Sequence, residues 1–164
     1  MGISARTYPN VARLTRRQLA ALGRVAVNCA AVEETARMVV GSLLKLDQGS
    51  NALLLLNRPH SAVLTLIADL APRLIEDRPS GLAWVKWSDE ARILSEERNR
   101  LLHMGWVVSE TGGLTGVRAA RTRKRPIPSL ETRELEEIED VADEALRLLA
   151  QSFAHYRTTP GFLA

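Results

Sequence analysis

The sequence predicts an all-α fold, an antiparallel bundle of four to five helices with a small β-hairpin ahead of the last helix. Aromatic residues make up only 4% of the 164 residues, while Leu, Ala, Arg and Glu dominate, and this composition favours helices over a sandwich or barrel. Apolar residues recur at three- and four-residue steps, the period of an amphipathic helix. With 46% hydrophobic residues, the chain can bury the core of one domain.

We predict a single helical domain over 15–157, preceded by an irregular N-terminal arm over 1–14 and followed by a C-terminal tail over 158–164. Pro9 and Asn10 lie in the arm, which has little hydrophobic periodicity. The chain has one cysteine and therefore no internal disulfide, which fits a reducing compartment. No segment has the pattern of a secretory signal or the length of a membrane span, so we expect a cytoplasmic protein without a membrane partner.

The first predicted helix is long and amphipathic. Thr15 and Gln18 have the spacing of a capping box, which marks its start. Turn residues over 47–51 should end it near Leu46, and a short apolar turn over 52–56 follows. Its apolar stripe consists of Leu22, Val25, Cys29, Val32, Ala36, Val40 and Leu43.

Two further helices are expected in the middle of the chain. Pro59 favours a helix start and predicts a helix over 60–75, which Pro72 should kink or shorten. A loop over 78–81 contains proline and glycine and separates this helix from the next. The periodicity that follows predicts a helix over 82–103.

One segment carries strand signals. Gly105 ends the preceding helix, and residues 106–109 and 114–117 contain the β-branched residues typical of strands. They flank a glycine pair at 112–113 that readily adopts the positive φ of a hairpin turn. We therefore expect these two segments to pair as a hairpin, the only strands in the chain.

A basic segment joins the hairpin to the last helix, which is predicted to run from about Leu130 or Thr132 to Tyr156. Such a density of positive charge suits an RNA phosphate backbone, although a short charged run is also typical of a solvated loop. The net charge of +3 is modest, so nucleic-acid contact depends on this local cluster. The cluster consists of Arg118, Arg121, Arg123, Lys124 and Arg125.

Arg98 stands where the apolar stripe of the helix over 82–103 should carry a leucine. A guanidinium keeps its proton, so its burial requires a carboxylate, a phosphate or a hydrated cleft. Glu33, at the edge of the first helix's stripe, is the candidate partner for a purely structural ion pair. Trp84 and Trp87 share the stripe and belong either to the core or to a dimer interface. The apolar residues within about 60° of Arg98 are Trp84, Trp87, Ala91, Leu94, Leu101 and Leu102.

The segment 97–103, with the sequence Glu-Arg-Asn-Arg-Leu-Leu-His, resembles the signature of the HEPN superfamily of helical domains. In that signature an arginine and a polar residue precede a histidine, and the predicted order of helices also suits the HEPN fold. Catalytic members of the superfamily are metal-independent endoribonucleases. The resemblance therefore implies RNA as the substrate, no metal or other cofactor, and products with a 2′,3′-cyclic phosphate and a 5′-hydroxyl.

The resemblance also implies a role for each residue of the signature. His103 would act as general base on a ribose 2′-hydroxyl, Arg98 would bind the scissile phosphate, and Asn99 would orient one of them. Imidazole titrates near neutral pH and guanidinium matches phosphate geometry, which suits these roles. Glu33 and Glu97 would support the site, and Arg100 would add an RNA contact.

Helix geometry favours a homodimer. On a regular helix Asn99 and His103 are about 40° apart, whereas Arg98 and His103 are about 140° apart. One helix does not easily direct both side chains at a single phosphate. Either the helix distorts at its end, or two copies of the helix meet and share a composite cleft, as in the dimers typical of the superfamily.

Alternatives remain for the histidines and for the whole chain. His103 is also well placed as a simple helix C-terminal residue, while His60 and His155 are interpreted as surface residues. The leading hypothesis is a ribonuclease acting as a toxin or in phage defence, with an antitoxin or regulatory protein as a possible partner. The alternative is a non-catalytic HEPN-like module that binds RNA or a protein, and a third option is a structural oligomerisation protein.

Overall fold

The computed structural model describes residues 14–103, 105–108, 114–119 and 128–162. Five helices pack together in this part of the chain, as predicted. Along the sequence, three short strands follow the fourth helix and precede the fifth, and they form a small sheet. The elements are α1 (Arg16–Leu43), α2 (Gln48–Leu55), α3 (His60–Leu74), α4 (Arg78–Leu102), β1 (Gly105–Val108), β2 (Leu114–Ala119), β3 (Pro128–Arg133) and α5 (Leu135–Thr158).

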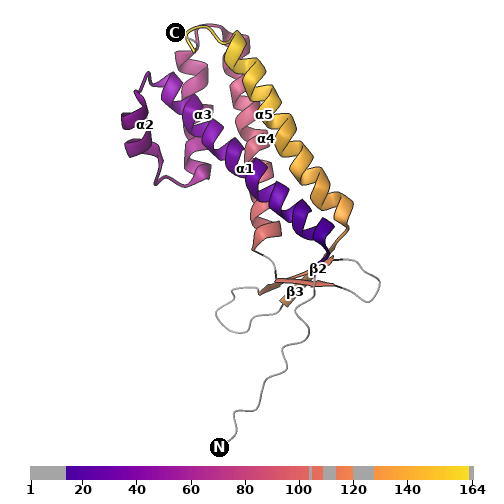
Figure 1. The fold of residues 1–164 in the computed structure, drawn as a ribbon. Coiled ribbons are helices and arrows are strands. Elements are labelled where there is room, and N and C mark those ends of the chain that lie inside the picture. The colour runs from indigo at the N-terminus through magenta and orange to yellow at the C-terminus, as the bar shows by residue number, and fades with distance from the viewer. Residues whose placement is uncertain (1–13, 104, 109–113, 120–127, 163–164) are drawn as a thin grey trace, which may run out of the picture.

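The helical part is built around α1 and α4. Helix α1 packs on α5 and α3, while α4 packs on α3 and α5, so the four long helices share one core. The short helix α2 packs on α1 at the side of the bundle, and the sheet lies at one end of it, next to the end of α4 and the start of α5 (Figure 1). In the described part of the chain, no helix combines the length and the apolar composition needed to cross a membrane.

Two tryptophans of α4 form the centre of the core. Trp84 and Trp87 are fully buried and meet edge to face, with ring centroids 5.5 Å apart. The Nε1 of Trp84 donates a hydrogen bond of 3.0 Å to Thr159 Oγ1, and the Nε1 of Trp87 donates one of 2.9 Å to the carbonyl of Leu148. Of the two alternatives for these residues, the structure shows the core.

Side-chain caps set the helix starts. The capping box predicted for α1 is present, because Thr15 Oγ1 accepts a hydrogen bond from the Gln18 backbone while Gln18 Oε1 accepts one from the Thr15 backbone. Asp47 caps α2, so most of the predicted turn at 47–56 is helical. Asp77 caps α4, whose first turn is the segment 78–81 that we expected to be a loop.

Helices α1 and α3 differ little from the prediction. Helix α1 ends at Leu43, three residues before the expected end, and Lys45 then adopts a positive φ of 52°. Helix α3 includes Pro72 and ends at Leu74. It approaches α4 so closely at Gly81 that a Cβ there would lie 3.1 Å from the carbonyl oxygen of Ala71.

The sheet contains one strand more than predicted. Strand β1 pairs antiparallel with β2, while the hairpin turn expected at 112–113 lies outside the described residues. Strand β3 pairs antiparallel with β2, with Leu130 opposite Val117. The prediction that the last helix starts at about 130–132 is therefore wrong, because those residues pair with β2 and the helix begins after Glu134.

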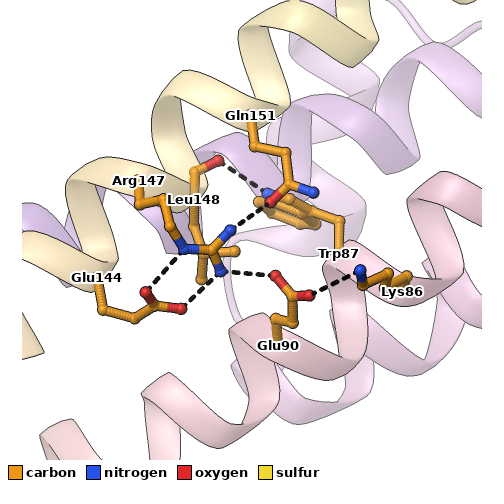
Figure 2. A network of polar contacts seen from close by, with 7 residues as sticks. All are labelled: Lys86, Trp87, Glu90, Glu144, Arg147, Leu148 and Gln151. Atoms are coloured by element: carbon orange, nitrogen blue, oxygen red, sulfur yellow. Dashed lines mark hydrogen bonds and ion pairs between the residues drawn. The ribbon is translucent and has the colours of Figure 1, made fainter.

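Polar contacts join α4 to α5 on the outer side of the core (Figure 2). Arg147 binds Glu144 on its own helix and Glu90 on α4, with nitrogen–oxygen distances of 2.6 and 2.7 Å. Lys86 lies 3.7 Å from the other oxygen of Glu90, and Gln151 accepts a hydrogen bond from Arg147. Such half-exposed ion pairs stabilise the fold weakly, so they fix the register of the two helices more than they add to stability.

Candidate functional site

Arg98 lies on α4 and faces α1. Its Nη2 lies 3.4 Å from Glu33 Oε1, so the expected ion pair is present, and its Nη1 donates a hydrogen bond of 2.9 Å to Asn99 Oδ1. The carboxylate does not seal the guanidinium from solvent, because 26% of the Arg98 side chain remains exposed. Arg98 can therefore keep its structural partner and still receive an anion.

Arg98 and Asn99 line a pocket of about 420 Å³ between α1, α4 and the start of α3. We call it the basic pocket, and it is defined by its charged residues and the histidine beside them. A larger pocket of about 630 Å³ near the C-terminal end of α5 has only Lys45 and Asp47 as charged lining residues. The defining residues of the basic pocket are Glu33, Arg37, Arg58, His60, Arg92, Glu96 and Arg98.

Positive charge dominates the basic pocket. Four guanidinium groups and two carboxylates line it, and a third carboxylate, that of Glu34, pairs with Arg37 from outside the lining, so positive charge stays in excess while His60 is neutral. Burial of His60 lowers the pKa of its imidazole below the ordinary value, and the nearby Glu33 only partly opposes this. The pocket thus favours anions, and His60 offers them a neutral ring that still carries one N–H group.

Several buried nitrogen atoms of these residues lack a hydrogen-bond partner. Among the described residues, Arg37 Nε, His60 Nδ1 and Arg98 Nε are buried and make no hydrogen bond. Buried polar groups in folded proteins are nearly always paired with protein, water or ligand. These three atoms belong to residues that line one pocket, so this region holds hydrogen-bonding capacity that the described part of the chain does not satisfy.

His103 is not part of the basic pocket. It is the C-terminal cap residue of α4, its side chain is exposed, and its backbone N–H donates a hydrogen bond of 3.2 Å to the carbonyl of Asn99. A single chain thus brings Arg98 and Asn99 to one pocket and leaves His103 outside it. The separation of Arg98 from His103 agrees with the angle of about 140° expected on a regular helix, whereas the small angle between Asn99 and His103 does not bring His103 to the pocket.

The other predicted site residues lie apart from the basic pocket or outside the described residues. Glu97 accepts ion pairs from Arg100 at 3.1 Å and from Arg133 at 2.7 Å, so it links α4 to the end of β3. Arg118 belongs to β2, and its side chain is outside the described part. The remaining residues of the basic segment, Arg121, Arg123, Lys124 and Arg125, are not among the described residues.

His60 and His155, interpreted as surface residues, are only partly exposed. His60 is half-buried at the start of α3, and His155 packs edge to face on Trp84 with ring centroids 5.4 Å apart. No pattern in the sequence joins His60 to Arg98. Arg92 and Asn99 are seven residues apart and so share one face of α4, but such a face is usually just solvated.

Comparisons with protein-family models, with curated proteins and with solved structures find no match for this chain. Within the described ranges, no three His, Cys, Asp or Glu side chains gather so that they could hold a metal ion. The basic pocket and the motif at the end of α4 are therefore the features of the described chain that point to a function.

Burial of His60 predicts a pH-dependent stability. Because the folded state holds the pKa of His60 below its ordinary 6.5, the unfolded chain binds more protons once the pH falls below about that value. We expect the free energy of unfolding to be constant above this pH and to decrease below it. Urea unfolding at several pH values should show a smaller decrease for His60→Gln, with part remaining because burial also lowers the pKa of His155. If the free energy of unfolding of His60→Gln depends on pH as that of the wild type does, the lowered pKa of His60 is not the cause of the decrease.

Proposed function

We propose that this chain is a metal-independent endoribonuclease that acts as a homodimer. One observation carries the proposal: Arg98 and Asn99, the first two residues of the HEPN-like motif, line a pocket with excess positive charge. RNA is a polyanion, and a half-exposed guanidinium binds its phosphate oxygens in a bidentate manner. The resemblance of the motif to the HEPN signature supplies the reaction type.

The proposed reaction uses the ribose next to the scissile phosphate. His103 removes the proton of the 2′-hydroxyl, and the resulting oxygen attacks phosphorus. The bond to the 5′-oxygen breaks, that oxygen takes a proton from solvent, and the products are a 2′,3′-cyclic phosphate and a 5′-hydroxyl. Arg98 stabilises the additional negative charge on the phosphate oxygens, while Asn99 holds Arg98 through the hydrogen bond of 2.9 Å.

A second copy of the chain completes the proposed site. His103 lies at the end of α4 and outside the basic pocket of its own chain, so an intact site needs His103 from a partner. An isologous dimer that brings two ends of α4 together would give each pocket the partner's imidazole. The same pairing would form one RNA groove from two equivalent surfaces.

The test is RNA cleavage in EDTA by the purified protein. We expect chelator-resistant cleavage, with rates lower by about 10²- to 10⁴-fold in Arg98→Ala and in His103→Ala. Arg73→Ala is the matched control, because Arg73 is exposed at the far end of α3 and lies outside the basic pocket. Circular dichroism checks the folding of each variant. Cleavage that EDTA abolishes, or that both variants retain, would contradict the proposal.

The exposed position of His103 favours a second candidate, a non-catalytic module that binds RNA. In that case Arg98 contacts phosphate and His103 only ends α4. RNA would bind without being cut, and binding would weaken in Arg98→Ala and on neutralising Arg121, Arg123 and Lys124, but not in His103→Ala. The same set of proteins thus separates the two candidates.

From the resemblance to the HEPN signature we also propose a biological setting. The nuclease would act in the cytoplasm as a toxin or in phage defence, and an antitoxin or regulatory protein would hold it in check. Expression of the wild-type chain and of Arg98→Ala in a host cell compares their effects on growth and on cellular RNA.

A further inference from the structure

The basic pocket contains more cationic groups than the proposed cleavage uses. Arg98 serves the scissile phosphate, while Arg37, Arg58, Arg92 and His60 have no part in that reaction. Arg37 belongs to α1 and Arg92 to α4. Arg58 lies in the turn before α3, and His60 is the first residue of α3. Segments far apart in the sequence therefore deliver basic groups to one place.

Many N–H groups of these arginines make no hydrogen bond within the described part of the chain. Arg92 has no hydrogen-bond or ion-pair partner among the described residues, and Arg58 uses only its Nε, which donates a hydrogen bond of 3.1 Å to the carbonyl of Leu54. Arg37 reaches Glu34 through Nη1 at 3.2 Å, which leaves its buried Nε unpaired. Each guanidinium thus has N–H groups left for a ligand.

The start of α3 adds to the attraction for anions. Pro59, His60 and Ser61 all line the pocket, and they are the N-cap and first two residues of a helix of 15 residues. No side chain caps this end, so the first backbone N–H groups have no acceptor inside the helix. A helix N-terminus carries a partial positive charge, and anions bind there readily.

The charge and size of the pocket select the type of anion. Arg37 and Arg98 each have a carboxylate partner, whereas Arg58 and Arg92 have none among the described residues. These two free guanidinium charges suit a phosphate monoester, which carries close to two negative charges at neutral pH, better than a phosphodiester, which carries one. A volume of about 420 Å³ lies in the range of small-molecule sites, so a nucleoside attached to the phosphate also has room.

We propose that the basic pocket is a binding site for a terminal phosphate monoester, with Arg37, Arg58 and Arg92 as its cationic ligands and His60 as a neutral hydrogen-bond donor. The 5′-phosphate of a free nucleotide and that of an RNA end share this chemistry. The inference does not depend on RNA cleavage, because binding needs neither His103 nor a second copy of the chain.

The binding test uses the full-length protein in EDTA and isothermal titration calorimetry. The probes are inorganic phosphate, adenosine, adenosine 5′-monophosphate, and a short 2′-O-methyl RNA with either a 5′-phosphate or a 5′-hydroxyl. The 2′-O-methyl group prevents cleavage, since no 2′-hydroxyl remains to attack. We expect inorganic phosphate and the monophosphate to bind at one per chain, and adenosine not to bind.

The two RNA forms identify the source of the phosphate. If the 5′-phosphate form binds more tightly than the 5′-hydroxyl form by about tenfold or more, the pocket accepts an RNA end. If the free monophosphate binds but the two RNA forms bind equally, the ligand is a free nucleotide. Absence of binding by both inorganic phosphate and the monophosphate overturns the proposal.

Variants locate the site. Arg58→Gln and Arg92→Gln should each weaken binding of the monophosphate by about tenfold or more, because each removes a charge-assisted hydrogen bond. Arg73→Gln is the matched control, since it removes an exposed arginine at the other end of α3 and should bind like the wild type. His103→Ala should also bind normally while losing RNA cleavage, which separates this proposal from the nuclease. Unchanged binding in an Arg58→Gln, Arg92→Gln double variant would overturn the assignment of the site.

Discussion

Mixing Arg98→Ala chains with His103→Ala chains is expected to restore about one quarter of the wild-type RNA cleavage, although neither variant cleaves alone. A dimer with composite sites takes Arg98 from one chain and His103 from the other. In a mixed dimer one site then has both residues intact and the other has neither. Random pairing makes about half of the dimers mixed, each with one working site of two, which gives the expected quarter.

The measurement is the cleavage rate after the two variants are unfolded together and refolded as a mixture. Each variant refolded alone gives the background rate. A mixture of Arg98→Ala with an Arg98→Ala, His103→Ala double variant is the matched control, because no pairing of those chains supplies Arg98. Cleavage that stays at the background in the first mixture would rule out a site shared between chains.

The contact between Arg98 and Glu33 could be predicted because it follows from helical periodicity. Arg98 lies on the inward stripe of α4 and Glu33 at the edge of the stripe of α1, so both side chains must face the space between these helices. An unpaired guanidinium at such a position is costly, and the carboxylate nearest to the stripe was the natural partner.

The rest of the basic pocket could not be predicted in this way. Arg37, Arg58 and His60 each have the pattern of an ordinary solvated residue in their own segment. They line one pocket only because the packing of α3 places its start against α1 and α4. That packing is a tertiary property, so the residues it gathers are not marked by the local sequence.

The differences in secondary structure have two distinct causes. Asp47 and Asp77 each stand three residues before a serine whose backbone N–H they bind, so the starts of α2 and α4 carry a capping signal that is visible in the sequence. Strand β3 carries no comparable signal, because it begins with Pro128 and is rich in polar residues. Its pairing with β2, and not its own propensity, makes it a strand.

The largest loss of stability is expected for Trp87→Ala. The indole is fully buried between α4 and α5, packs against Trp84, and donates a hydrogen bond of 2.9 Å to the carbonyl of Leu148. Removing it creates a large cavity in the core, and such substitutions lower the free energy of unfolding by about 3–5 kcal/mol. Urea unfolding followed by circular dichroism measures the difference.

Trp87→Phe is the matched control for this prediction, because it keeps an aromatic ring but removes the N–H donor. We expect it to lower the free energy of unfolding by about 1–2 kcal/mol, the combined effect of one lost hydrogen bond and a smaller cavity. Equal losses in the two variants would mean that the hydrogen bond, and not the filled volume, holds α5 against α4. Since α4 also carries Arg92 and Arg98, the packing at Trp87 fixes the helix on which both proposed phosphate contacts depend.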